Sequence, residues 1–148
     1  MSECFSETGL RFACRQCSHC CRHEPGFVYV SARDLSRLCR YFSLCRADFI
    51  STYCRWVEYY DGTHVLCLKE KPGYDCILWD CGCTAYEARP VQCSTYPFWT
   101  HIVANKRSWE QEALSCPGIN EGAVHTWQEI EQKRRLYETN TPLRRGEE

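Results

Sequence analysis

The sequence contains no long hydrophobic run and almost no net charge, and these two absences exclude several classes of protein. No apolar stretch approaches the roughly 20 residues that a membrane-spanning helix requires, so we expect no membrane insertion. The 18 basic and 19 acidic side chains leave a formal net charge of −1. This balance provides no general attraction for phosphate backbones, and we do not expect nucleic acid as a partner.

Signatures of common enzymes and of export are also missing. The sequence has no glycine-rich phosphate-binding loop, no H-E-x-x-H motif and no internal repeat. A secretory signal peptide has a basic start followed by an apolar stretch, whereas Glu3 and Glu7 interrupt any such stretch here. We therefore expect a cytoplasmic protein.

Fourteen cysteines stand out against these absences. A chain of 148 residues can bury a core without covalent cross-links, so the thiols need another explanation. In a reducing cytosol, many cysteines indicate metal ligands or redox chemistry more often than a disulfide network. The even count would also permit full pairing, and structural disulfides are the alternative.

Local patterns predict an α+β fold, a small single domain organised by metal, with short helices, a β-hairpin and long cysteine-rich loops. Ser31 and Asp34 have the spacing of a capping box, which predicts a helix from about Ala32. A second helical run is expected over about 44–57. Asp61-Gly62 lies between two β-prone runs and predicts a hairpin with a type I′ turn.

Further along, residues 74–79 predict a short strand, and an amphipathic helix is expected after Gly122. Five side chains follow helical spacing in that segment: Val124, Trp127, Ile130, Arg134 and Tyr137. Residues 1–138 are expected to form the cysteine-cluster domain. Residues 139–148 contain few apolar side chains and predict a flexible C-terminal tail.

The strongest motif is CRQCSHCC, which places four cysteines as C-x2-C-x2-C-C: Cys14, Cys17, Cys20 and Cys21. A C-x2-C loop can turn both of its sulfurs toward a single metal ion. In extended chain, the adjacent Cys20 and Cys21 would point to opposite sides. We therefore expect more than one metal ion.

A second group of cysteines is spread over the later half of the chain: Cys76, Cys83, Cys93 and Cys116. Three prolines lie close to the later thiols: Pro90, Pro97 and Pro117. Because proline fixes φ and limits the entropy of a loop, these segments are suited to hold ligands in place.

The segments CRQCSHCC, CTAYEARPVQCSTYPF and CPGI together resemble the YkgJ-type cysteine-cluster family, described as zinc- or iron-chelating domains, over roughly 12–122. The resemblance implies that the eight cysteines of both groups are metal ligands. It also implies that Arg89-Pro90 and Tyr96-Pro97-Phe98 accompany them as a signature. Ser18 and Ser94 depart from the family pattern, which usually has glycine and arginine there.

What the resemblance implies about function is metal binding, with zinc or iron as the cofactor and thiolates organising the fold. One alternative is a redox or catalytic metalloprotein that holds iron or an iron–sulfur cluster. A second alternative is an accessory domain with a protein partner, because a related cluster occurs in flagellin lysine N-methylases. Neither catalytic residues nor an enzymatic activity follow from the sequence.

The other cysteines and the histidines have less defined predictions. Cys39, Cys45 and Cys54 lie on the expected helices and are predicted to be small buried hydrophobic residues. Cys81 could replace Cys83 as a ligand or act as a resolving thiol, and the role of Cys67 stays open. Cys4 is expected to be exposed. His19 and His23 flank the first cluster and could ligate metal or hydrogen-bond to the thiolates, although ordinary surface positions are the simpler interpretation. Arg15, Arg22 and Arg89 could donate N–H groups to sulfur.

Overall fold

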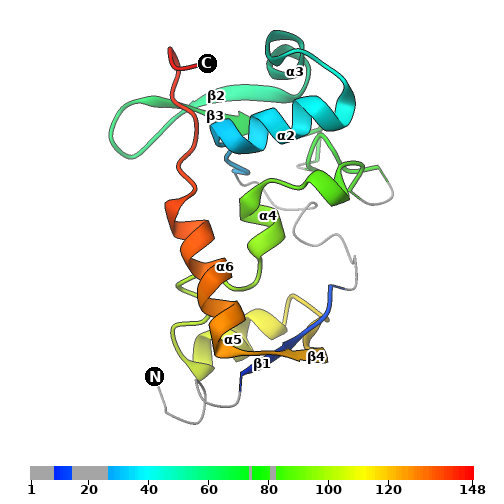
Figure 1. The fold of residues 1–148 in the computed structure, drawn as a ribbon, viewed down its shortest axis with the longest axis vertical. Helices are drawn as coiled ribbons and strands as arrows, with labels where there is room; N and C mark the ends of the chain where they lie inside the picture. Colours follow the sequence, from blue (N-terminus) through cyan, green and yellow to red (C-terminus); the bar gives the residue numbers. More distant parts are fainter. Residues whose placement is uncertain (1–8, 15–26, 74, 81–82) are drawn as a thin grey trace. The chain divides into compact units, whose positions relative to one another are not determined.

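The structure is a computed structural model that describes residues 9–14, 27–73, 75–80 and 83–148. The chain divides into two compact units. Unit 1 comprises Met1–His19 and Thr95–Thr139, and unit 2 comprises Cys20–Ser94 and Asn140–Glu148. The described residues form five α-helices and two small antiparallel sheets, which confirms the mixed α and β character (Figure 1). The expectation of a single domain, which came from the sequence, stays a prediction.

In the described part of unit 2, the first helix is α2 (Ala32–Phe42), which begins at the predicted residue. The capping box is present: the Ser31 hydroxyl accepts from the Asp34 N–H at 3.1 Å, and the Asp34 carboxylate accepts from the Ser31 N–H at 3.1 Å. These bonds satisfy main-chain donors at the helix start. Leu35 and Leu38 are fully buried and turn the apolar face of α2 into the core.

The second helix is shorter than predicted. Helix α3 covers Arg46–Tyr53, and the chain then enters strand β2 (Cys54–Glu58), which pairs with β3 (His64–Leu68). The prediction of helix to residue 57 was wrong because Cys54, Trp56 and Val57 are well suited to a half-buried strand. The predicted hairpin is confirmed.

The hairpin turn differs in type from the prediction. The Tyr59 carbonyl accepts from the Gly62 N–H at 3.0 Å, and the Tyr59 N–H donates to the Thr63 carbonyl at 2.7 Å. Gly62 has φ +82°, whereas Asp61 has no positive φ. A type I′ turn needs positive φ at both central residues, so this is a type I turn followed by a glycine bulge.

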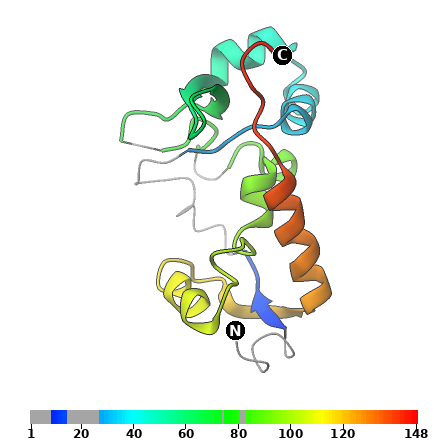
Figure 2. The same cartoon turned by 90° about the vertical axis from the view of Figure 1, so that its left-hand side faces the viewer.

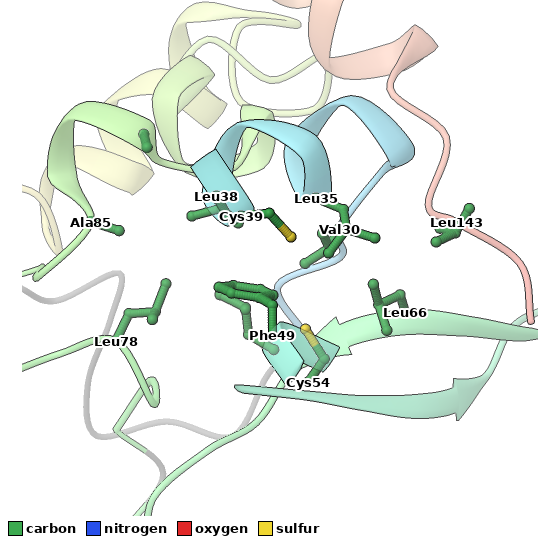
Figure 3. Close-up of a cluster of buried hydrophobic side chains, with 12 residues drawn as sticks. Val30, Leu35, Leu38, Cys39, Phe49, Cys54, Leu66, Leu78, Ala85 and Leu143 are labelled. Atoms are coloured by element: carbon green, nitrogen blue, oxygen red, sulfur yellow. The ribbon is translucent and has the colours of Figure 1, made fainter. Parts of the chain in front are cut away.

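Strand β3 lies between β2 and two further segments. The Leu68 N–H donates to the Val28 carbonyl, and the Leu66 N–H donates to the Leu143 carbonyl, both at 2.9 Å. Leu143 is only 5% exposed and joins Val30 and Leu66 in the core of unit 2 (Figure 3). The segment predicted as a flexible tail therefore packs on the sheet, because Leu143 buries an apolar side chain there.

The remaining part of unit 2 is a set of turns. The strand predicted over 74–79 is not formed by its described residues, which make only isolated bridges, from Cys76 to Glu70 and from Trp79 to Cys83. A short 3-10 helix η2 (Tyr86–Ala88) and helix α4 (Val91–Thr95) follow. The last residue of α4, Thr95, already belongs to unit 1, whose second segment begins there.

Unit 1 is built on a pair of strands from distant parts of the chain. Strand β1 (Leu10–Phe12) pairs antiparallel with β4 (Ile119–His125), as Figure 2 shows. Helices α5 (Lys106–Ala113) and α6 (Trp127–Thr139) complete it. The core of unit 1 consists of Leu10, Phe98, Ile102, Val103, Trp109, Cys116, Ile119 and Ile130. The predicted C-terminal helix is present from Trp127, while Val124 belongs to the strand.

None of the helices formed by the described residues has the length and apolarity needed to cross a membrane.

Candidate metal centre

Five of the eight predicted ligands lie among the described residues. Unit 1 contains Cys14 and Cys116, and unit 2 contains Cys76, Cys83 and Cys93. The other predicted or considered groups lie outside the described residues: Cys4, Cys17, Cys20, Cys21, Cys81, His19, His23, Arg15 and Arg22.

In unit 1, the segments carrying Cys14 and Cys116 lie side by side. The Ala13 N–H donates to the Gly118 carbonyl at 3.1 Å. A Cβ on Gly118 would lie 2.1 Å from the Ala13 carbonyl oxygen, so only glycine permits this approach. Cys14 directly follows Ala13 and is exposed, and Cys116 precedes Gly118 by two residues and is 9% exposed. Gly118 of the CPGI segment thus allows the segments that carry these two predicted ligands to lie next to each other.

In unit 2, Trp79 lies next to both Cys76 and Cys83. The Trp79 N–H donates to the Cys76 carbonyl at 2.9 Å, and Trp79 forms a β-bridge with Cys83. Both cysteines are half-buried and pack against the hydrophobic core of unit 2. These contacts keep both cysteines at the margin of one core.

Cys93 lies on α4, which is tied to α2 by a buried carboxylate. The Asp34 side chain is fully buried and accepts from the Val91 N–H at 3.0 Å. It also accepts from Arg37 at 2.6 Å and from the Asn140 amide at 3.1 Å. A charge-assisted network of this kind fixes its members in place. The sequence indicated Asp34 as a capping residue, and it gave no signal for these long-range contacts.

The residues around Cys93 also hold the chain that follows the first cysteine cluster. The Gln92 side-chain amide donates to the Phe27 carbonyl at 2.7 Å and accepts from the Tyr29 N–H at 3.0 Å. The Arg89 guanidinium lies 3.9 Å from the centre of the Tyr86 ring, and its Nε donates to the Tyr86 carbonyl at 2.9 Å. Arg89 was a predicted donor to sulfur, and the described contacts of its guanidinium are with Tyr86.

The second part of the signature is structural. Phe98 is 1% exposed in the core of unit 1 and stacks on Trp109, with ring centroids 5.9 Å apart and an interplanar angle of 7°. The Tyr96 hydroxyl donates to the Glu112 carboxylate. Tyr96 and Phe98 therefore stabilise the segment that leads to Cys116, and the structure assigns them no separate chemical role.

The cysteines outside the predicted ligand set fall into two environments. Cys39, Cys54 and Cys67 are buried in unit 2. Burial raises the pKa of Cys54 to about 12 and also raises the pKa of Cys39 and Cys67. Cys39 and Cys54 are buried as predicted, whereas Cys45 is exposed at the start of α3, so its predicted burial was wrong.

Across the described ranges, no three His, Cys, Asp or Glu side chains are grouped in a way that could hold a metal ion. The described ligand candidates lie in unit 1 (Cys14, Cys116) and in unit 2 (Cys76, Cys83, Cys93), and every further cysteine of the CRQCSHCC motif after Cys14 lies outside those ranges. Sulfur is nevertheless the donor that zinc and iron–sulfur clusters take in proteins, so the chemistry of the donor set fits either metal.

Models of known protein families give no match to this chain. No solved structure matches it either.

Proposed function

We propose that the protein binds zinc or iron through cysteine thiolates, at more than one ion, and that the metal organises its loops. The observation that carries the proposal is the contact between Ala13 and Gly118, which brings the segments of Cys14 and Cys116 together from opposite ends of the chain. A hydrogen bond of this kind needs no metal. It does, however, bring together the backbone segments that carry two cysteines predicted as ligands from the sequence.

The donor count supports more than one ion. Four thiolates complete a tetrahedral structural zinc site, and the eight predicted ligands are twice that number. In unit 1, Cys17 follows Cys14 in the same C-x2-C motif and would be the next donor. In unit 2, Cys76 and Cys83 would combine with donors from the CRQCSHCC motif or with Cys93. When bound, such ions supply folding free energy to the segments that carry their ligands.

Iron, including an iron–sulfur cluster, is the second candidate because the same all-sulfur donor set suits it. A redox or catalytic role would require a labile or open coordination position. The third candidate, an accessory domain for modification of another protein, would use the metal only to hold a binding surface.

The test is metal analysis of the full chain purified without oxygen. We expect colourless protein with zinc at a fixed ratio, or brown protein with iron and sulfide. Cys83→Ala and Cys14→Ala should each lower the metal content, because each removes one thiolate donor. Cys45→Ala is the matched control and should leave it unchanged, since Cys45 is exposed and is not a predicted ligand.

Two results would contradict the proposal. One is wild-type protein that is fully folded and free of metal. The other is full metal content in both ligand variants.

A further inference from the structure

A basic surface lies on α2 and α3, away from the predicted ligands in the sequence. Arg33, Arg37 and Arg40 come from α2, and Arg46 is the first residue of α3. Together with Ala32 and Ser36, these four arginines line a depression of about 410 Å³. We call the four arginines the arginine patch.

Contacts within unit 2 hold the patch in place. The Arg46 guanidinium donates to the Ser36 hydroxyl at 2.9 Å, which fixes the start of α3 beside α2. Arg37 donates to the buried Asp34 carboxylate at 2.6 Å and to the Arg89 carbonyl at 2.9 Å. Two of the four guanidinium groups are therefore positioned before any ligand arrives.

Carboxylates of the described residues neutralise only part of the positive charge of the patch. Among the described residues, Arg37 has a carboxylate partner, whereas Arg33, Arg40 and Arg46 form no ion pair. Arg33 lies in the first turn of α2, where the helix dipole disfavours a positive charge. It also precedes Arg37 by four residues on the helix, a spacing at which two positive charges repel each other. This arrangement lowers the stability of the helix, and an anionic ligand would relieve it.

The lining of the depression restricts the chemistry of that ligand. Guanidinium groups bind phosphate and carboxylate through paired N–H donors. Among the described residues that line the depression, Ala32 is the one apolar side chain, and none of them is aromatic. A nucleobase or an acyl chain would therefore find no stacking or apolar surface there.

Charge complementarity identifies the ligand more closely. Four arginines against the single Asp34 carboxylate leave three formal positive charges. A phosphorylated serine carries about −1.5 to −2 charges at neutral pH, and one adjacent acidic side chain adds another. We propose that the arginine patch binds an acidic phosphorylated segment of a partner protein.

The test is fluorescence anisotropy with the full-length, metal-loaded protein. The probe is a labelled peptide that contains phosphoserine followed by two glutamates. Arg40→Gln should weaken binding about tenfold, the effect of losing one charged hydrogen-bonding partner. Arg40→Lys keeps the charge but loses the paired donors, and it should retain part of the affinity. Binding should also weaken as salt is raised.

Arg107→Gln is the matched control because Arg107 is an exposed arginine on α5, outside the patch. It should bind the probe as the wild type does. Metal content and circular dichroism should be the same in all variants, which separates this proposal from the proposed metal site. The double variant Arg33→Gln/Arg40→Gln should bind more weakly than either single variant.

Four results would overturn the proposal. Equal binding of the unphosphorylated peptide would remove the role of the phosphate. Equal or tighter binding of pyrophosphate would show a small-anion site, and equal or tighter binding of an oligothymidylate would show a nucleic-acid surface. Unchanged affinity in the double variant would place the peptide elsewhere.

Discussion

Unit 2 contains cysteines of two kinds, separated by a few residues in the sequence. Cys54 and Cys67 lie on paired strands, are 4% and 0% exposed, and have raised pKa values. Cys76 and Cys83 lie on the turn that follows and are half-buried at the margin of the same core. The difference shows that the number of cysteines does not give the number of ligands, because burial in an apolar core holds a thiol in its protonated form.

The largest effect should come from removing the metal that we propose. A structural zinc site contributes about 10 kcal/mol at neutral pH, which is as large as the whole stability of many domains. Chelation under reducing conditions should therefore abolish cooperative unfolding, as followed by circular dichroism during a thermal scan. Restoring the metal should restore the transition. An unchanged unfolding transition after complete metal removal would contradict the proposal. It would mean that the loop thiols, like the core thiols, hold no metal that stabilises the fold.

The next effect concerns the link between the core and the loop that carries Cys93. Asp34→Ala should lower the free energy of unfolding by about 3–5 kcal/mol, because it leaves Arg37 and several main-chain donors without their buried acceptor. Urea denaturation measures the loss. Asp48→Ala, which changes a carboxylate in the first turn of α3, is the control and should cost less than about 1 kcal/mol. Equal losses in both variants would show that Asp34 does not anchor α4.

A smaller effect should appear in the pH dependence of stability. Below pH 9 the Cys54 thiol is protonated in the folded and unfolded chains, so it adds no pH dependence. Between pH 9 and about 12 the unfolded chain releases this proton while the folded chain keeps it, so stability falls as pH rises. The expected slope from this one group is about 1.4 kcal/mol per pH unit.

Chemical denaturation at pH 8 to 10.5 measures this slope for the wild type and for Cys54→Ala. The variant should lose the contribution, and Cys45→Ala should keep it. A wild-type slope no steeper than that of Cys54→Ala would mean that Cys54 ionises as readily in the fold as in the unfolded chain.

The smallest effect should be that of Cys45→Ala alone. The Cys45 side chain is exposed and makes no capping hydrogen bond at the start of α3. The free energy of unfolding should change by less than about 0.5 kcal/mol, as for other surface substitutions. A larger loss in urea denaturation would indicate that Cys45 belongs with the structural thiols.

Local signals in the sequence predicted the local elements well. The Ser31 and Asp34 capping box placed the start of α2, and Asp61-Gly62 placed the hairpin. The turn type was wrong, because the same dipeptide also fits a type I turn with a glycine bulge.

Elements that depend on distant partners were missed. Strands β1 and β4 pair across more than a hundred residues, and no local pattern specifies that pairing. Leu143 was assigned to a flexible tail because one apolar residue among polar neighbours carries no periodicity, yet β3 supplies it with a partner.

The sequence predicted which residues belong to the candidate site, but it did not predict how these residues are arranged in space. The motifs pointed to Cys14 and Cys116, and the structure adds that Gly118 is what brings their segments together. Arg89 fits the predicted signature but contacts Tyr86, because a guanidinium can satisfy its donors on a nearby carbonyl and aromatic ring.

The most direct test of the division between core and loop thiols is differential alkylation mapped by mass spectrometry, before and after chelation. Cys76 and Cys83 should be protected in the metal-loaded protein and become modified once the metal is removed. Cys45 should react in both states, and Cys54 should react only after the core unfolds. Equal modification of Cys76 and Cys83 with and without chelator would contradict the account.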